Sequence, residues 1–223
     1  MTIKTNARLA GFTFLFYIAA GISSMVLLGR ATSGEGIAAK LAGIAQHATD
    51  VRVVIVLTVL TSLSALVLAV TLYAITRVWD PDLAMLALTC RVVEGVTGAS
   101  SIPGLLGLLS LATAAGANAP DTAASHALDA YLLGQGSGVS ATFFAVGSTL
   151  FCWLLLRGRM IPVPLAWLGV CASVLLVLAL PPELAGFLRG RATWWIWMPM
   201  LAFEVPLAVW LLIKGVAVQA TRD

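Results

Sequence analysis

Long apolar segments recur along this chain, and their length constrains its fold more than any other feature. A helix needs about 20 residues to cross the hydrocarbon core of a bilayer. Segments at least about that long lie at 9–29, 53–76, 82–114, 138–156, 164–182 and 194–213. Only 10% of the residues are charged, against about a quarter in soluble domains. We therefore predict an all-α, polytopic membrane protein, with a six-helix transmembrane bundle forming one domain over 1–223.

The segments between the predicted spans are short, and two of them have helical patterns. Residues 35–48 follow a capping-box pair, Thr32 and Glu35, and their apolar residues recur on one helical face. The segment 115–137 contains a helix start at Pro120-Asp121. We predict a short interfacial helix in each of these outer loops.

Basic residues near the span ends favour an orientation with both termini in the cytoplasm. Lys4 and Arg8 precede the first span, which is too long for a cleaved signal peptide and is expected to be retained. The net charge of +3 is small and the basic residues are scattered, so no nucleic-acid partner is expected.

The cysteines and histidines do not form a recognisable metal or disulfide pattern. Cys90, Cys152 and Cys171 all fall within predicted spans, where we expect them to be small buried hydrophobic residues. His47 and His126 lie in separate outer loops. Nucleotide-binding and hydrolase motifs are missing from the sequence. We therefore predict neither a metal site nor a cofactor.

Ionisable residues inside the spans are the main candidates for a functional site, because such residues are costly in a bilayer. Arg91 and Glu94 lie roughly 15 and 20 Å beyond Pro81, which marks a helix start. Glu204 lies roughly 15 Å before the end marked by Lys214. Since the hydrocarbon core is about 30 Å thick, all three side chains are predicted near its middle.

Two further polar residues are expected at the same depth. Tyr17 and Ser148 each lie roughly 14 Å from the basic end of their span. Arginine keeps its proton, so Arg91 and two ionised glutamates would leave one uncompensated negative charge. One glutamate should therefore hold a proton, or a bound cation should neutralise it. We predict that Arg91 pairs with Glu204, whose depth matches, and that Glu94 is the protonated acid.

Prolines close to these charges predict irregular helices. Pro103 and Pro206 each remove one backbone hydrogen bond from their span. We expect a kink near each of them, and the freed carbonyl groups would add acceptors to the interior.

Four stretches of the chain carry a resemblance to a known family. They read ARLAGFTFLFYIAAGI, LTCRVVEG, LLLRGRMIPVPLAWLGV and FEVPLAVWLLIKG. In this order they resemble the bacterial membrane proteins grouped as domain-of-unknown-function family 4386. The resemblance implies a multi-span protein of the bacterial inner membrane and no particular activity. A histidine-containing segment of the family reads AYLLGQGSG here, so no role for that histidine carries over.

Three functions are consistent with these observations. The first is binding or passage of a small apolar or amphipathic molecule, with Arg91, Glu94, Glu204, Tyr17 and Ser148 as its ligand-binding residues. The second is an intramembrane enzyme that uses protonated Glu94 as general acid on a lipid or isoprenoid. The third is an ion pair that only holds the bundle together. The expected partners are membrane lipids and a small hydrophobic ligand.

Overall fold

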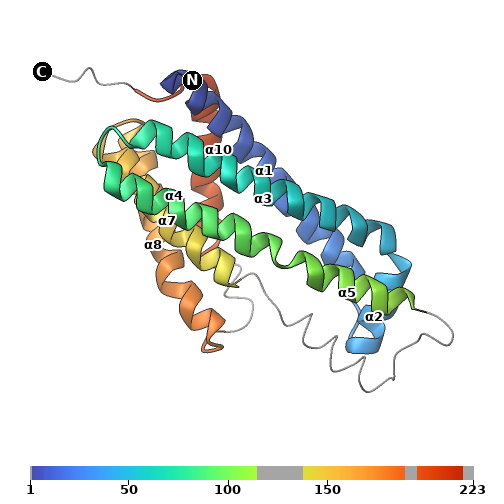
Figure 1. Cartoon of the computed structure of the whole chain (residues 1–223). Coiled ribbons are helices and arrows are strands. Elements are labelled where there is room, and N and C mark those ends of the chain that lie inside the picture. The colour runs from blue at the N-terminus through green and yellow to red at the C-terminus, as the bar shows by residue number, and fades with distance from the viewer. Residues whose placement is uncertain (1, 115–137, 189–194, 218–223) are drawn as a thin grey trace, which may run out of the picture.

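The computed structural model describes residues 2–114, 138–188 and 195–217, and in these ranges the regular structure is entirely α-helical (Figure 1). The helices are α1 (Ile3–Ala31), α2 (Ile37–Gln46), α3 (Ala48–Thr76), α4 (Pro81–Ala99), α5 (Ile102–Thr113), α7 (Gly138–Arg157), α8 (Val163–Leu184) and α10 (Met198–Ile213). The predicted all-α class is confirmed for the described part of the chain.

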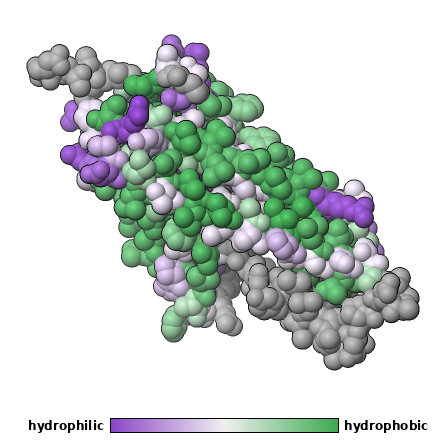
Figure 2. Space-filling view, in the orientation of Figure 1, coloured by the Kyte–Doolittle hydropathy of each residue, from purple (hydrophilic) through white to green (hydrophobic). Residues whose placement is uncertain are grey.

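Five helical segments are long and apolar enough to cross a membrane. They are α1, α3, the combined segment Pro81–Thr113, α7 and α8. The sixth predicted span corresponds to α10, which has 16 residues and is shorter than the usual crossing length. Figure 2 shows hydrophobic residues over the middle of the visible face, with hydrophilic residues gathered toward its ends. This distribution is the one a membrane helix bundle requires.

Polar contacts join several chain segments at the end of the molecule where α1 begins and α10 ends (Figure 1). Asp80 caps α4 by accepting a hydrogen bond from the amide of Leu83 at 3.1 Å. The same carboxylate pairs with Arg157, at the end of α7, at 3.2 Å. The amide of Ala217, beyond α10, donates to the carbonyl of Met160, between α7 and α8, at 3.0 Å. The ends of α7 and α10 and the start of α4 therefore lie together.

The last described helix runs antiparallel to the first. Gly11 of α1 lies so close to α10 that a Cβ atom there would be 2.6 Å from the carbonyl oxygen of Ala208 and from the amide nitrogen of Leu212. Toward the other end, Met25 of α1 and Met198 of α10 line one cavity. The contact of α1 with α10 places one wall of the candidate site.

The segment predicted as the third span contains a break. α4 ends at Ala99 and α5 begins at Ile102, with Ser100 and Ser101 between them. Pro103 falls in the first turn of α5. Backbone N–H groups there have no intrahelical partner, so the missing N–H of proline costs no hydrogen bond. The irregularity predicted at Pro103 is thus confirmed, as a break. α10 is helical on both sides of Pro206.

This break separates two groups of buried apolar residues. The larger group fills the space among α1, α3, α4, α7, α8 and α10. The smaller one consists of Ala31, Ile44, Val51, Leu108 and Leu109, and it joins α2 and α5 to the ends of α1 and α3. Arg91 and Glu94 belong to α4 and hence lie beside the larger group.

Two sequence predictions about local structure need correction. The capping box of Thr32 and Glu35 does not form, because α1 extends to Ala31 and the Thr32 hydroxyl donates to the carbonyl of Leu28. The N-cap of α2 is instead Gly36, whose positive φ of 78° turns the chain. Cys171 is exposed on α8 and not buried, since it lies on the apolar outer surface of the bundle.

Of the two helices predicted in loops, the structure describes only the first. Residues 37–46 of the first are helical, as predicted for 35–48. The helix predicted from Pro120-Asp121 lies outside the described residues.

Candidate functional site

The centre of the candidate site is an ion pair within α4. Arg91 and Glu94 lie one helical turn apart, with Arg91 Nη1 at 2.8 Å from Glu94 Oε2. Their side chains are 1% and 3% exposed. The predicted pairing of Arg91 with Glu204 is therefore wrong. Residues at i and i+3 are neighbours on one helix face, whereas equal depth on two helices does not make two side chains meet.

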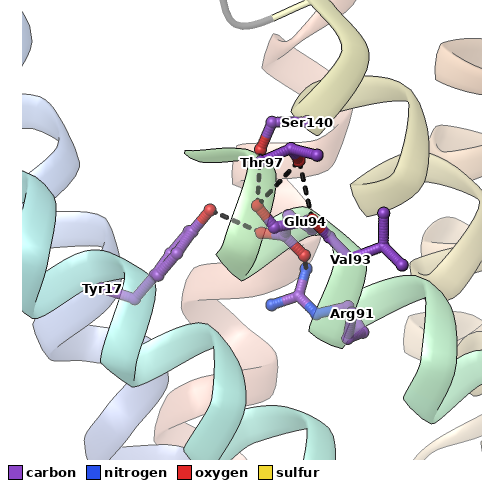
Figure 3. A network of polar contacts seen from close by, with 6 residues as sticks. All are labelled: Tyr17, Arg91, Val93, Glu94, Thr97 and Ser140. Atoms are coloured by element: carbon purple, nitrogen blue, oxygen red, sulfur yellow. Dashed lines mark hydrogen bonds and ion pairs between the residues drawn. The ribbon is translucent and has the colours of Figure 1, made fainter. Parts of the chain in front are cut away.

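Two other helices contribute hydrogen bonds to Glu94 (Figure 3). The hydroxyl of Tyr17, on α1, donates to Glu94 Oε1 at 2.8 Å. The hydroxyl of Ser140, on α7, donates to the backbone carbonyl of Glu94 at 2.9 Å. Glu94 therefore connects three helices through its side chain and its backbone. The Tyr17 hydrogen bond and the Arg91 ion pair together fix the carboxylate in one orientation.

The guanidinium of Arg91 packs against aromatic rings. Its carbon lies 4.9 Å from the ring centre of Phe144 and 5.8 Å from that of Tyr17. Gly147 leaves room for this packing, since a Cβ there would be 3.0 Å from Arg91 Cγ. Cation–π contacts are worth about 2 kcal/mol when desolvated. The guanidinium nitrogens make no well-directed hydrogen bond in the described part of the chain. The cation–π contacts offset this loss.

Glu204 is the third buried ionisable residue, and it is not part of the pair. It lies on α10 with 7% of its surface exposed. Its Oε1 is buried and has no hydrogen-bond partner among the described residues. Glu204 lies close to Tyr17, because the two residues line one cavity. A carboxyl group with an unpartnered buried oxygen is costly for the fold, so it calls for an explanation.

A cavity of about 540 Å³ begins at Glu204 and Tyr17. It lies between α1, α10 and the end of α8. Its lining residues are Tyr17, Ile18, Gly21, Ile22, Met25, Glu183, Trp197, Met198, Met200, Leu201 and Glu204. From Tyr17 to Met25 it follows α1 for roughly 12 Å. The cavity is therefore a mostly apolar groove, with Tyr17 and Glu204 at its deep end and Glu183 also on its wall.

Tyr17 links the cavity to the ion pair, because it lines the former and donates to Glu94. The structure thus brings together four of the predicted residues: Tyr17, Arg91, Glu94 and Glu204. The fifth, Ser148, is buried on α7. Among the described residues, Ser148 has no hydrogen bond to the other four.

Three contributors to the site were missed from the sequence: Phe144, Trp197 and Ser140. Phe144 packs on Arg91, and its ring lies 5.9 Å from that of Trp197, which lines the cavity. Ser140 was missed as well. An apolar ring or a serine in an apolar helix carries no sequence signal of its neighbours. The small residue Gly147 after ATFFAV was the nearest hint that a bulky side chain from another helix packs there.

The described residues contain no group of three or more His, Cys, Asp and Glu side chains arranged to hold a metal ion. The chemistry available at the site is therefore that of a fixed carboxylate, a buried guanidinium, a phenol and an unpartnered carboxyl group.

Comparison with known proteins identifies one family. A family model described as Domain of unknown function (DUF4386) matches residues 9–215, which include every residue of the site. No significant similarity to a curated protein or to a solved structure was found.

Proposed function

Since this chain belongs to the family described as Domain of unknown function (DUF4386), we propose a function for it from the site: it binds or passes a small amphipathic molecule within the membrane. The observation that carries this proposal is the cavity between α1 and α10. Its volume of about 540 Å³ falls within the roughly 300–1,000 Å³ of typical ligand pockets. Its apolar length and polar deep end match the two parts of an amphipath.

The rim of the cavity supports entry from the bilayer. Ile22 and Met25 of α1 are 45% and 47% exposed, and Met198 of α10 is 42% exposed. These apolar side chains lie on the outer surface of the bundle, where lipid chains replace water. A lipid-like molecule can therefore reach the deep end from the side, without crossing the aqueous phase.

A six-crossing topology accounts for these contacts best. α10 packs antiparallel along α1, from Gly11 to Met25, and α1 is long enough to span the membrane. With Trp195 and Ile196, which are also helical, α10 covers much of the same depth. α2, with 10 residues, is too short to cross, and we propose that it lies along the outer surface. We assign the protein to the bacterial inner membrane, with both termini cytoplasmic.

Cysteine labelling tests this topology in a background without Cys90, Cys152 and Cys171. In spheroplasts, an impermeant maleimide should label Ser33→Cys and Phe187→Cys at once. Asp82→Cys and Lys214→Cys should react only after permeabilisation. The reverse pattern would overturn the orientation, and immediate labelling of Lys214→Cys alone would remove the sixth crossing. Spin labels along 37–46 should report a single depth.

Filling the cavity should prevent binding. A Cβ at Gly21 meets no atom within 4 Å, and Gly21 lines the cavity, so the Gly21→Trp variant should direct its indole into the cavity. We expect mass spectrometry of the purified wild-type protein to find a co-purifying amphipath near one equivalent, and Gly21→Trp to lose roughly 80% of it, which requires binding weakened by well over tenfold.

Ala19→Trp is the matched control, because Ala19 is exposed on the same helix and does not line the cavity. It should retain the molecule. Equal retention by both variants would contradict the proposal, as would a wild-type protein that carries no small molecule.

Enzymatic turnover is the second candidate function, with Glu94 as general acid. Less in the structure supports it, because Glu94 is held between Arg91 and Tyr17 as a paired carboxylate, and a general acid needs a proton to give. Chemical conversion of the co-purifying molecule during incubation would favour this alternative.

A further inference from the structure

We infer that the cavity selects amphipaths whose polar group is a cation, and in particular a protonated amine. This inference rests on the proposed function and names the chemical class of its ligand. It follows from the charges that the fold buries at the deep end of the cavity and from the side chains that line the rest of it.

The buried charges leave one carboxyl group without a partner. Arg91 and Glu94 neutralise each other at 2.8 Å. Glu204 shares the cavity with Tyr17, which donates to Glu94. It is 93% buried and has an oxygen with no hydrogen-bond partner in the described part of the chain. A ligand ammonium group against Glu204 would supply both a positive charge and N–H donors. Charge-assisted hydrogen bonds of this kind are roughly twice as strong as neutral ones.

The remaining lining residues also favour a cation. Glu183, at the end of α8, adds a second carboxylate to the cavity wall. Trp197 and Tyr17 add aromatic faces, which attract cations. Among the described residues that line the cavity, there is no lysine and no arginine. The wall therefore carries negative and aromatic groups only, apart from its apolar surface.

An anionic head group has no equivalent partner among the described residues that line the cavity. Arg91 does not line the cavity. It is 1% exposed and is covered by Glu94 and by the rings of Tyr17 and Phe144. A carboxylate or phosphate in the cavity would instead face Glu204. A neutral alcohol could hydrogen-bond to Glu204, but it would bring no positive charge to this carboxyl group.

Three probes with the same alkyl chain test the inference: dodecylamine, dodecanol and dodecanoic acid. Binding to the purified protein in nanodiscs is measured by calorimetry near neutral pH, where the amine is protonated. We expect dodecylamine to bind the wild-type protein about tenfold more tightly than dodecanol, and dodecanoic acid to bind more weakly than either. The Glu204→Gln variant should lose this preference for the amine and keep its affinity for dodecanol.

Glu35→Gln is the control for loss of a negative charge, because Glu35 is an exposed carboxylate between α1 and α2, away from the cavity. It should leave all three affinities unchanged. A wild-type protein without preference for the amine, or an unchanged preference in Glu204→Gln, would overturn the inference. So would tighter binding of the acid than of the amine.

The Gly21→Trp variant distinguishes failure of the cation inference from failure of the proposed function. If it weakens the binding of amine and alcohol alike while Glu204→Gln has no effect on their ratio, the cavity binds amphipaths without selecting a cation. If Gly21→Trp weakens neither probe, the cavity is not the binding site, and both proposals are overturned.

Discussion

Glu94→Gln should destabilise the protein far more than Glu204→Gln. The glutamine amide leaves the guanidinium of Arg91 buried without a counter-charge. Its NH2 group also replaces one of the two carboxylate oxygens, which lie 2.8 Å from Arg91 Nη1 and from the Tyr17 hydroxyl. Breaking a buried pair by removing one charge costs roughly 3–5 kcal/mol in soluble proteins. Glu204 has no ion-pair partner in the described part of the chain, so a glutamine of similar shape breaks no such contact there.

Thermal unfolding in detergent measures this difference, with the two variants side by side. We expect a loss of several degrees in melting temperature for Glu94→Gln, which corresponds to the free-energy cost above. Glu204→Gln should melt within about a degree of the wild type. Equal losses would show that Arg91 is shared between both glutamates, and a larger loss for Glu204→Gln would restore the pairing predicted from depth.

Gly11→Ala and Gly21→Ala should change stability in opposite directions, although both glycines lie on α1. At Gly11 the new Cβ would be 2.6 Å from backbone atoms of Ala208 and Leu212, which cannot rotate away. α1 and α10 must then separate, and overpacking of this kind costs about 1–3 kcal/mol. At Gly21 the Cβ meets no atom within 4 Å, so the higher helix propensity of alanine should stabilise by about 0.5–1 kcal/mol.

The same unfolding assay decides this prediction, and the two variants serve as controls for each other. Destabilisation by both would mean that the glycines are needed for flexibility of α1 and not for close packing. Stabilisation by both would mean that α10 does not approach α1 at Gly11.

The depth of the polar residues could be predicted from the sequence, because helix rise is constant and helix ends have recognisable signals. Asp80 and Pro81 mark the start of α4, and counting from there placed Arg91 and Glu94 in the interior. Counting along a helix gives height but not the direction in which a side chain points across the bundle. The pairing of Arg91 was therefore predicted with the wrong glutamate, although four site residues were correctly brought together.

Other features depend on packing that leaves no sequence pattern. Phe144 is one of several apolar residues of α7, and nothing in its surroundings distinguishes the ring that covers Arg91. The end of α1 was also predicted too early, so Thr32 was assigned to the start of the next helix. In both cases the local sequence allows more than one structure, and tertiary contacts decide which of them forms.

The antiparallel contact of α1 with α10 has a consequence for biosynthesis. A chain is made from its N-terminus, and α10 follows every other described helix that lines the cavity. Tyr17 and Glu94 are therefore both present in the nascent chain before Glu204 is translated. Until α10 packs against Gly11, the groove along α1 remains open to lipid. The cavity is thus the last part of the molecule to be completed, and a chain released before α10 would retain the ion pair but contain no cavity.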